Sequence, residues 1–278
     1  MAWSGVAFAL ASPGAGGLGS RLSKYLHPLA GRPLVWHTLH AAAALDPAPA
    51  SLVVVGGPEL SPELFGDLPV EVHVAAHDDP ELAERVAKEI EGGEVLALDA
   101  AAPCAADWLR RLMDAPPGLL LEDPRGRPLA AWLPAGRVGA LLRSPQAFAA
   151  VGELVAPDAR FVEPEGFVVE SRHELSRASV RVRDRLVRSL MEGGATFLLP
   201  DTVLVDVDVR LGRDTVVYPN VVLEGQTTVG DETVIGPGCR IVDSWIGSGV
   251  ELKGYNYLSH TSVRNRAILE PHVRRGFD

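Results

Sequence analysis

An aliphatic residue returns at every sixth position from Val205 onward, and this period constrains the fold more than any other feature of the chain. The positions are Val205, Leu211, Val217, Leu223, Val229, Ile235 and Ile241. Four residues after each of the first six stands a small or β-branched residue: Val209, Thr215, Val221, Thr227, Thr233 and Cys239. An amphipathic helix needs apolar returns at three and four residues, so the period excludes a long helix. It predicts a left-handed parallel β-helix of very short strands, whose inward aliphatic side chains stack on their equivalents one coil away.

The repeat has two further features, glycines at recurring positions and one change of phase. Glycine often follows the aliphatic position, and we expect it to turn the corner between two strands: Gly212, Gly230, Gly236 and Gly247. The phase slips by one residue at Ile246 and resumes at Leu252 and Leu258, and beyond Arg264 the pattern blurs. Because three hexapeptides make one triangular coil, the repeat region gives about four coils.

A β-helix this short predicts self-association. So few coils bury little core for each residue, and the last coil leaves strand edges open. Three prisms packed side by side would cover apolar side faces, so we expect a homotrimer. A monomeric β-helix is the alternative.

The first 200 residues alternate predicted strands and helices. Continuous apolar runs predict buried strands at Val6–Leu10, Leu52–Gly56 and Glu94–Asp99. Helical patterns follow at Pro33–Leu45, Glu81–Glu91 and around Trp108–Met113. Together they indicate an α/β domain whose parallel sheet is covered on both faces. A linker helix at about residues 174–193 leads out of it, so we expect an α/β domain over residues 1–200 and the β-helix over residues 201–278.

Composition narrows the classes of partner. The 26 basic and 36 acidic residues give a net charge of −10, which argues against a nucleic-acid partner because such surfaces must neutralise phosphates. No apolar run reaches the ~18 residues of a membrane span, and the N-terminus lacks a signal-peptide pattern. We therefore expect a cytoplasmic protein with no membrane partner. Cys104 and Cys239 lie far apart and fit neither a disulfide framework nor a zinc cluster.

A glycine-rich segment, Gly14–Gly19, follows the first predicted strand. A glycine loop at the carboxyl edge of a sheet is where α/β folds bind phosphates. Arg21 and Lys24 would add two cationic donors beside the same loop. A glycine-rich turn is also common after a first strand, so these residues alone leave phosphate binding and an ordinary turn equally open.

Two stretches of sequence carry a resemblance to a known family. The first is Gly17-Leu-Gly-Ser-Arg21 with Lys24-Tyr-Leu-His-Pro-Leu-Ala-Gly-Arg-Pro-Leu34, and the second runs through the repeats in Asp206–Gly225 and Ile235–Ser244. They resemble bacterial N-acetylglucosamine-1-phosphate uridyltransferase, also called UDP-N-acetylglucosamine pyrophosphorylase. The likeness covers most of the chain in order and is poor in its middle. It implies a Rossmann-like nucleotidyltransferase domain followed by the β-helix.

The resemblance also implies a reaction and a site. The family transfers a uridylyl group from UTP to a sugar 1-phosphate, and such chemistry needs charge neutralisation and in-line positioning. By motif, the phosphate-binding residues become Gly17, Gly19 and Ser20, with Arg21 and Lys24 as the catalytic cations. The family holds Mg²⁺ with an Asp after a later strand and an Asn before the linker helix. The nearest candidates are Asp99 and Glu170.

The sequence departs from the family's pattern at the residues that would carry out this chemistry. In the register set by Pro103, the metal Asp becomes Ala101, and Asp99 stands two residues early. The family's Asn becomes Glu170, which changes the charge and reach of that position. Pro80–Val86 holds no counterpart of the family's uracil-reading segment. The stretch from Cys104 to Phe167 is too short for the family's usual sugar-binding lobe. We expect no acetyltransferase activity, because the sequence ends at Asp278, before the coils that carry that site in the family.

Three hypotheses about function remain open. The first is a non-catalytic relative, a pseudoenzyme that serves as a trimeric scaffold, a regulator or a partner subunit for another protein. The second is an active nucleotidyltransferase that forms a UDP-sugar, with a nucleotide or nucleotide-sugar as ligand and Mg²⁺ held by Asp99 and Glu170. The third is an acyltransferase between β-helix subunits, for which His260 and His272 are the candidates.

Overall fold

The computed structural model describes residues 2–10, 18–90, 93–142 and 148–276. The chain divides into two compact units. The sheet unit comprises Met1–His27 and Pro33–Leu175, and the β-helix unit comprises Pro28–Arg32 and Ser176–Asp278. The domain boundary expected at residue 200 stays a prediction. Among the described residues, no helix is both long enough and apolar enough to cross a membrane.

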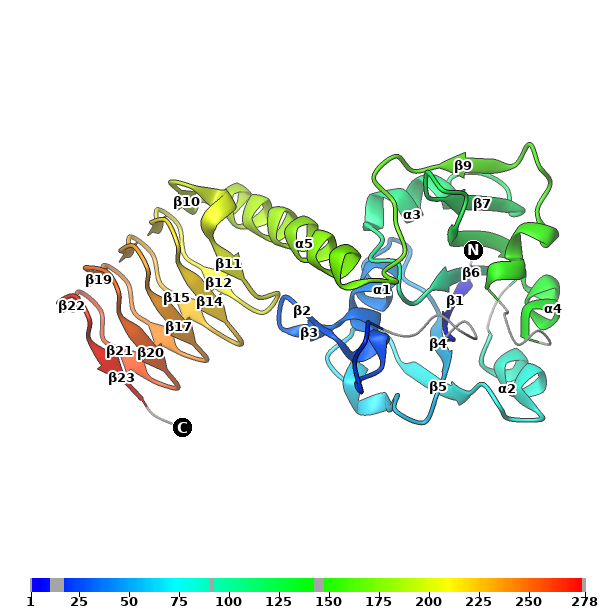
Figure 1. Cartoon of the computed structure of the whole chain (residues 1–278), viewed down its shortest axis with the longest axis horizontal. Helices are drawn as coiled ribbons and strands as arrows, with labels where there is room; N and C mark the ends of the chain where they lie inside the picture. Colours follow the sequence, from blue (N-terminus) through cyan, green and yellow to red (C-terminus); the bar gives the residue numbers. More distant parts are fainter. Residues whose placement is uncertain (1, 11–17, 91–92, 143–147, 277–278) are drawn as a thin grey trace. The chain divides into compact units, whose positions relative to one another are not determined.

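The sheet unit is built on seven strands in the order β5-β4-β1-β6-β8-β7-β9 (Figure 1). Their bounds are β1 Trp3–Ala9, β4 Ser51–Gly56, β5 Val72–Ala76, β6 Glu94–Asp99, β7 Leu119–Glu122, β8 Pro128–Pro134 and β9 Arg160–Val162. The predicted strands are β1, β4 and β6, which pair in parallel at the centre. The sheet is mixed rather than wholly parallel, because β8 runs antiparallel to β6 and β7. A short turn joins β7 to β8, and such turns connect only antiparallel neighbours.

In the part of this unit that the structure describes, four short helices accompany the sheet: α1 Leu34–Ala43, α2 Leu82–Glu89, α3 Ala106–Met113 and α4 Val138–Leu142. The three helices predicted in the first 113 residues are α1, α2 and α3. Helix α1 contacts α3, whereas α2 contacts α4. Buried side chains of α2 and α4, such as Val86 and Leu141, share one core with Val6 and Phe8 of β1. Single 3₁₀ turns lie at Lys24–Leu26, Pro62–Phe65, Ala135–Arg137 and Ala149–Leu154.

Helix α5, Arg172–Glu192, begins in the sheet unit and continues into the β-helix unit. From β10 onward, successive strands belong in turn to three parallel sheets, and the 3₁₀ turn Pro200–Thr202 lies between β10 and β11. The first contains β10 Thr196–Phe197, β13 Val216–Val217, β16 Val234–Ile235, β19 Glu251–Leu252 and β22 Ile268–Leu269. The second contains β11 Leu204–Val205, β14 Val222–Glu224, β17 Arg240–Val242, β20 Tyr257–Ser259 and β23 Arg274–Arg275. The third contains β12 Arg210–Leu211, β15 Thr228–Val229, β18 Trp245–Ile246 and β21 Ser262–Val263.

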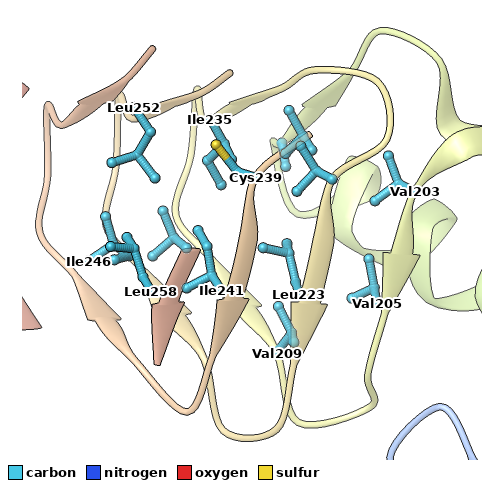
Figure 2. Packing of buried hydrophobic residues seen from close by; sticks show 14 of the residues in the cluster. Val203, Val205, Val209, Leu223, Ile235, Cys239, Ile241, Ile246, Leu252 and Leu258 are labelled. Carbon is cyan, nitrogen blue, oxygen red and sulfur yellow. The ribbon is translucent and has the colours of Figure 1, made fainter. Parts of the chain in front are cut away.

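The register confirms the predicted left-handed β-helix. Val205 pairs with Leu223, which pairs with Ile241, so equivalent residues stand one coil apart. The predicted phase slip is visible in the pairing of Val229 with Ile246. The inward aliphatic side chains form one continuous column (Figure 2). They include Val217, Leu223, Ile235, Ile241, Ile246, Leu252 and Leu258, all with no exposed surface.

The small residues that precede the strands are also buried, and their polar atoms are satisfied. The hydroxyl group of Thr215 donates to the carbonyl of Gly230 at 3.0 Å, and that of Thr233 donates to Gly247 at 2.9 Å. The thiol of Cys239 lies 3.6 Å from the Asn256 side-chain oxygen, so Cys239 is a packed free thiol, as expected. These bonds allow hydroxyl groups in a core that is otherwise apolar.

The glycines after the aliphatic positions have a different role from the one predicted. Gly236 has an ordinary backbone conformation, but a Cβ atom there would overlap the Leu252 carbonyl oxygen of the next coil. The left-handed corners are instead formed by residues such as Gly225, Asn220 and Asp243. Glycine at position 236 is therefore required by the close approach of two coils.

A hairpin from the N-terminal region completes the β-helix unit. Strands β2 (Pro28–Leu29) and β3 (Arg32–Pro33) pair with each other. The Ala30 carbonyl accepts a hydrogen bond of 3.1 Å from the Val207 amide, and Arg32 forms an ion pair of 2.7 Å with Asp208. Asp208 of the first coil thus has a structural partner in the hairpin, and the Asp206 carboxylate accepts a hydrogen bond of 2.9 Å from the Gly225 amide of the next coil.

Candidate functional site

Strand β6 ends at Asp99, and the turn that follows it is closed and buried. The Asp99 carboxylate accepts a hydrogen bond of 2.7 Å from the Ala101 amide. Ala100 and Ala101 have no exposed surface, and the Thr38 hydroxyl group donates to the Ala102 carbonyl at 2.9 Å. The Ala101 carbonyl accepts a hydrogen bond of 2.9 Å from the Val169 amide, which places the residue before Glu170 against this turn. The two positions that the resemblance pairs at a metal, 101 and 170, are thus neighbours.

The electrostatics link Asp99 to Lys24. Burial raises the pKa of Asp99 to about 6, although the charge of Lys24 and the hydrogen bond from Ala101 act in the opposite direction. Burial and the charges of Asp99, Glu59 and Glu170 also raise the pKa of Tyr25. The Tyr25 hydroxyl group donates to the Leu10 carbonyl at 2.7 Å, which is compatible with its staying protonated. Lys24, Tyr25, Asp99 and Glu170 therefore share one electrostatic environment.

The predicted phosphate loop is described only in part. Gly17 lies outside the described residues. Gly19 adopts a left-handed conformation with φ of 62°, which favours glycine. The Ser20 hydroxyl group accepts a hydrogen bond of 3.1 Å from the Leu22 amide, and Ser20 and Arg21 are exposed. The ammonium group of Lys24 lies 5.1 Å from the ring of Tyr25.

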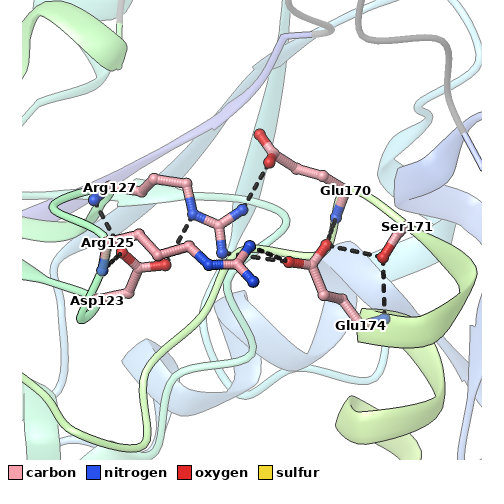
Figure 3. Close-up of polar contacts among 6 residues, drawn as sticks. All are labelled: Asp123, Arg125, Arg127, Glu170, Ser171 and Glu174. Carbon is pink, nitrogen blue, oxygen red and sulfur yellow. Dashed lines mark hydrogen bonds and ion pairs between the residues drawn. The ribbon is translucent and has the colours of Figure 1, made fainter.

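Glu170 has a cationic partner that the sequence analysis did not predict. Its carboxylate forms an ion pair of 2.6 Å with the Nη1 of Arg127 (Figure 3). Arg127 ends the turn between β7 and β8, and it also pairs with Asp123 at 2.7 Å and Glu174 at 3.4 Å. Burial lowers the pKa of Arg127, but the hydrogen bonds and charges of Asp123 and Glu170 outweigh this effect and raise it overall. Arg127 is therefore a permanent positive charge at this place.

The turn and the helix that supply these carboxylates are built locally. One Asp123 oxygen accepts the amides of Arg125 and Arg127, each at 2.9 Å, which closes the turn. At the other side, the Ser171 hydroxyl group accepts the Glu174 amide at 3.1 Å, and the Glu174 carboxylate accepts the Glu170 amide at 2.9 Å. This is a variant of the capping box, in which Glu174 reaches the amide one residue before the N-cap Ser171; it begins helix α5 and fixes the Glu174 side chain.

The residues present do not fit a bound divalent cation at Glu170. Such a cation needs several free oxygen ligands, whereas Arg127 takes up the Glu170 carboxylate and the Ala101 amide takes one oxygen of Asp99. Among the described residues, no group of three or more His, Cys, Asp and Glu side chains is arranged to hold a metal ion. We therefore assign no chemical step to Mg²⁺.

The sequence contained signals for the residues that were missed. Ser171 and Glu174 stand at the spacing of a capping box directly before an apolar helical pattern. Asp123 opens a turn of the type Asp-Pro-Arg-Gly. Neither signal reveals that Arg127 reaches Glu170, because the two residues are 43 positions apart.

Comparison with known proteins supports the assignment of hexapeptide repeats in the C-terminal part of the chain. The family model for bacterial transferase hexapeptide (six repeats) matches residues 208–242. The bifunctional protein GlmU of Caldanaerobacter subterraneus subsp. tengcongensis is 41% identical over 108 residues, which are 38% of this chain and 23% of that protein. GlmU of Clostridium botulinum (strain Kyoto / Type A2) is 38% identical over 126 residues, 45% of this chain and 24% of that protein. The C-terminal part of this chain is GlmU-like. The match spans about a quarter of the length of these GlmU relatives.

Two solved structures are also similar to this chain over about two thirds of its length. A Bacillus anthracis protein assigned as a glucose-1-phosphate thymidylyltransferase has a TM-score of 0.45 and 13% identity, and covers 65% of this chain and 95% of its own. Rv0371c of Mycobacterium tuberculosis H37Rv has a TM-score of 0.48 and 16% identity, and covers 64% of this chain and 98% of its own.

Proposed function

We propose that the chain is a non-catalytic relative of the GlmU-type nucleotidyltransferases that acts as a trimeric scaffold, regulator or partner subunit. The observation that carries this proposal is the ion pair of 2.6 Å between Arg127 and Glu170. Uridylyl transfer needs a cation that neutralises the phosphates of the nucleotide. An arginine that compensates Glu170 leaves this carboxylate unable to recruit a divalent cation.

The turn after β6 supports the same proposal. The position that resembles the family's metal Asp is Ala101, and an alanine methyl group offers no ligand. Asp99 cannot simply replace it, because its carboxylate closes the turn through the Ala101 amide. Rebuilding this turn would also break the bond between Ala101 and Val169.

Exposed apolar side chains on the β-helix support association with further copies of the chain. Leu204, Trp245 and Ile268 are 57%, 48% and 61% exposed, and each belongs to a different one of the three sheets. Large apolar side chains on the outside of short coils favour contact with another subunit. A partner subunit of another kind could use the same surfaces.

Lys24 favours one alternative, an active Mg²⁺-dependent nucleotidyltransferase that forms a UDP-sugar. Its charge acts on Asp99, so a cation and a carboxylate share one electrostatic environment. Phosphate binding uses such cations. In this alternative Asp99 and Glu170 would have to leave their present partners.

Isothermal titration of the full chain with UTP, with and without Mg²⁺, tests the proposal. We expect no saturable binding at millimolar UTP that Mg²⁺ strengthens. Saturable binding that tightens with Mg²⁺ would contradict the proposal and favour the active alternative. In that case Arg21→Ala should abolish the binding, whereas Arg110→Ala, an exposed arginine of helix α3, should leave it unchanged.

A further inference from the structure

One corner of the β-helix gathers exposed apolar side chains at the same place in successive coils. This corner follows the strands of the first parallel sheet and precedes those of the second. Large side chains after β10, β13 and β19 are exposed there: Leu198 by 48%, Leu199 by 54%, Tyr218 by 37% and Tyr255 by 60%. With two prolines of the same turns they form a surface that we call the apolar edge: Leu198, Leu199, Tyr218, Pro219, Pro237 and Tyr255.

Backbone hydrogen bonds stack the turns of the apolar edge on one another. The Gly238 amide donates to the Pro219 carbonyl at 3.1 Å, and the Tyr255 amide donates to the Pro237 carbonyl at 2.8 Å. The Tyr255 ring lies over Gly238, where a Cβ atom would be 2.7 Å from it, and stacks on His272 with 5.4 Å between the ring centroids. The apolar edge is therefore continuous along the coils, as expected for a repeated structure.

The charges at this corner cancel. Each Lys, Arg, Asp or Glu side chain in its described turns has an opposite partner. Lys253 forms an ion pair of 2.7 Å with Glu270, and Asp201 lies 3.8 Å from the guanidinium group of Arg183 in α5. The surface beside the exposed tyrosines thus has no net charge from these residues.

The corner between the second and third sheets differs in both respects. The hairpin already covers its first turn, since the Val207 amide donates to the Ala30 carbonyl at 3.1 Å. Its next turns hold Glu224 and Asp243, and Asp243 is exposed. This corner is therefore partly occupied by the chain itself and acidic beyond that point.

The corner between the third and first sheets carries like charges at the same level. Asp231 and Glu232 stand in one exposed turn, and Arg264 and Arg266 stand in another. Copies related by an axis parallel to the coils meet residue for residue, so like charges of this kind would oppose each other. A neutral, apolar corner can meet its own equivalents without this repulsion.

We propose that the apolar edge is the surface on which three copies of this chain meet, in parallel, around a three-fold axis that runs along it. This inference rests on the proposed function, in which the chain is a trimer, and names the surface that the trimer uses. Leu204, Trp245 and Ile268 lie on three different sheets, so their exposure alone selects no side of the β-helix. In the assembly, Tyr218 and Tyr255 of each copy lie beside the same residues of the other two.

Charge placed on the apolar edge tests this inference. Each of the variants Y218D and Y255D puts three carboxylates close to the axis, and like charges across an interface cost several kcal/mol. Light scattering of the full chain over a range of concentrations should give three chains for the native protein at micromolar concentration. The midpoint of dissociation should rise by at least about tenfold in each variant. Q226D is the control, because it adds the same charge at an exposed position of the corner between the second and third sheets. It should keep the native midpoint.

Cross-linking tests the same surface without added charge and does not depend on how well Y218D or Y255D folds. The native thiols, Cys104 and Cys239, are buried. In L199C a short bifunctional maleimide should form covalent dimers, because each linker joins two of three neighbouring thiols. Q226C is again the control, and L199C should react at least about tenfold faster than Q226C, since its thiols are held close together.

The outcomes separate this inference from the proposed function. Y218D and Y255D proteins that keep the native midpoint, or L199C chains that join no faster than Q226C chains, would overturn the inference and leave the trimer in place. A native chain that scatters as a single chain would overturn both. Loss of the trimer in Y218D and Y255D but not in Q226D, together with selective cross-linking of L199C, would support the inference.

Discussion

The amide of Val169 donates a hydrogen bond of 2.9 Å to the carbonyl oxygen of Ala101. This bond joins the turn after β6 to the segment before α5, and so brings together positions 101 and 170, which the sequence resemblance pairs at a metal. Ala101 supplies only a methyl group, and Glu170 is bound by Arg127.

The raised pKa of Asp99 predicts a specific pH dependence of stability. Burial raises this pKa to about 6 from an ordinary value of 3.8, so the folded chain holds a proton between these pH values that the unfolded chain has released. The stabilising contribution is complete below about pH 4 and is lost as the pH rises through about 6.

Asp99→Asn should remove this dependence. The free energy of unfolding of the variant minus that of the native chain should therefore rise between pH 4 and pH 7, by up to about 3 kcal/mol. Urea unfolding at several pH values measures the difference. Asp78→Asn, at an exposed carboxylate of the same unit, is the control and should show no such trend. Parallel pH profiles for Asp99→Asn and the native chain would contradict the assignment.

Alternation along β19 predicts effects of very different size for substitutions at two adjacent residues. Leu252 has no exposed surface and belongs to the β-helix core, whereas Glu251 is exposed. Leu252→Ala should reduce the free energy of unfolding by about 2–5 kcal/mol, because it removes buried contacts and leaves a cavity. Glu251→Ala should change it by less than about 0.5 kcal/mol. Equal losses of unfolding free energy for the two variants, measured by denaturant unfolding, would mean that the assigned inward and outward positions of β19 are wrong.

The close approach of coils predicts that Gly236 does not tolerate a side chain. A Cβ atom at this position would overlap backbone atoms at Leu252 and Gly254 of the next coil. Gly236→Ala should therefore destabilise the chain by about 1–3 kcal/mol. Gly136→Ala is the matched control, since its Cβ would meet no atom within 4 Å, and it should be neutral or slightly stabilising. Chemical denaturation of both variants measures these changes in the free energy of unfolding. A Gly236→Ala variant as stable as the native chain would contradict the explanation.

The proposed trimer predicts the mass of the protein in solution. Light scattering at micromolar concentration should give three times the 29.6 kDa mass of one chain. Leu204, Trp245 and Ile268 are the apolar side chains that a trimer would cover in part. A mass equal to one chain would show that the β-helix is monomeric.

The β-helix could be predicted from sequence in detail because its fold is a repetition. Each position from Val205 to Leu258 meets its own equivalent, so the period alone determines the core, including the phase slip at Ile246. Strands β1, β4 and β6 were also visible, since each is a continuous apolar run at the buried centre of the sheet. The role of Gly236 was not visible, because it depends on the distance between coils.

The candidate site was harder to predict because its contacts are distant in sequence. Asp99 and Glu170 could be named from their motifs, but the partner of Glu170 is Arg127, in a turn that reads only as a loop. Strand β8 was likewise missed, since Pro128–Pro134 has proline at both ends. The assignment of Asp99 and Glu170 as magnesium ligands, and of Gly19, Ser20, Arg21 and Lys24 as phosphate-binding residues, stays a prediction.

The most direct test of the central claim is a pyrophosphate-release assay with the full chain, UTP, Mg²⁺ and N-acetylglucosamine 1-phosphate. A non-catalytic relative should release no pyrophosphate above the rate without protein, and Arg127→Met should not change that result. Release that requires the sugar phosphate and Mg²⁺, and that Glu170→Ala abolishes, would contradict the account and make the chain an active nucleotidyltransferase.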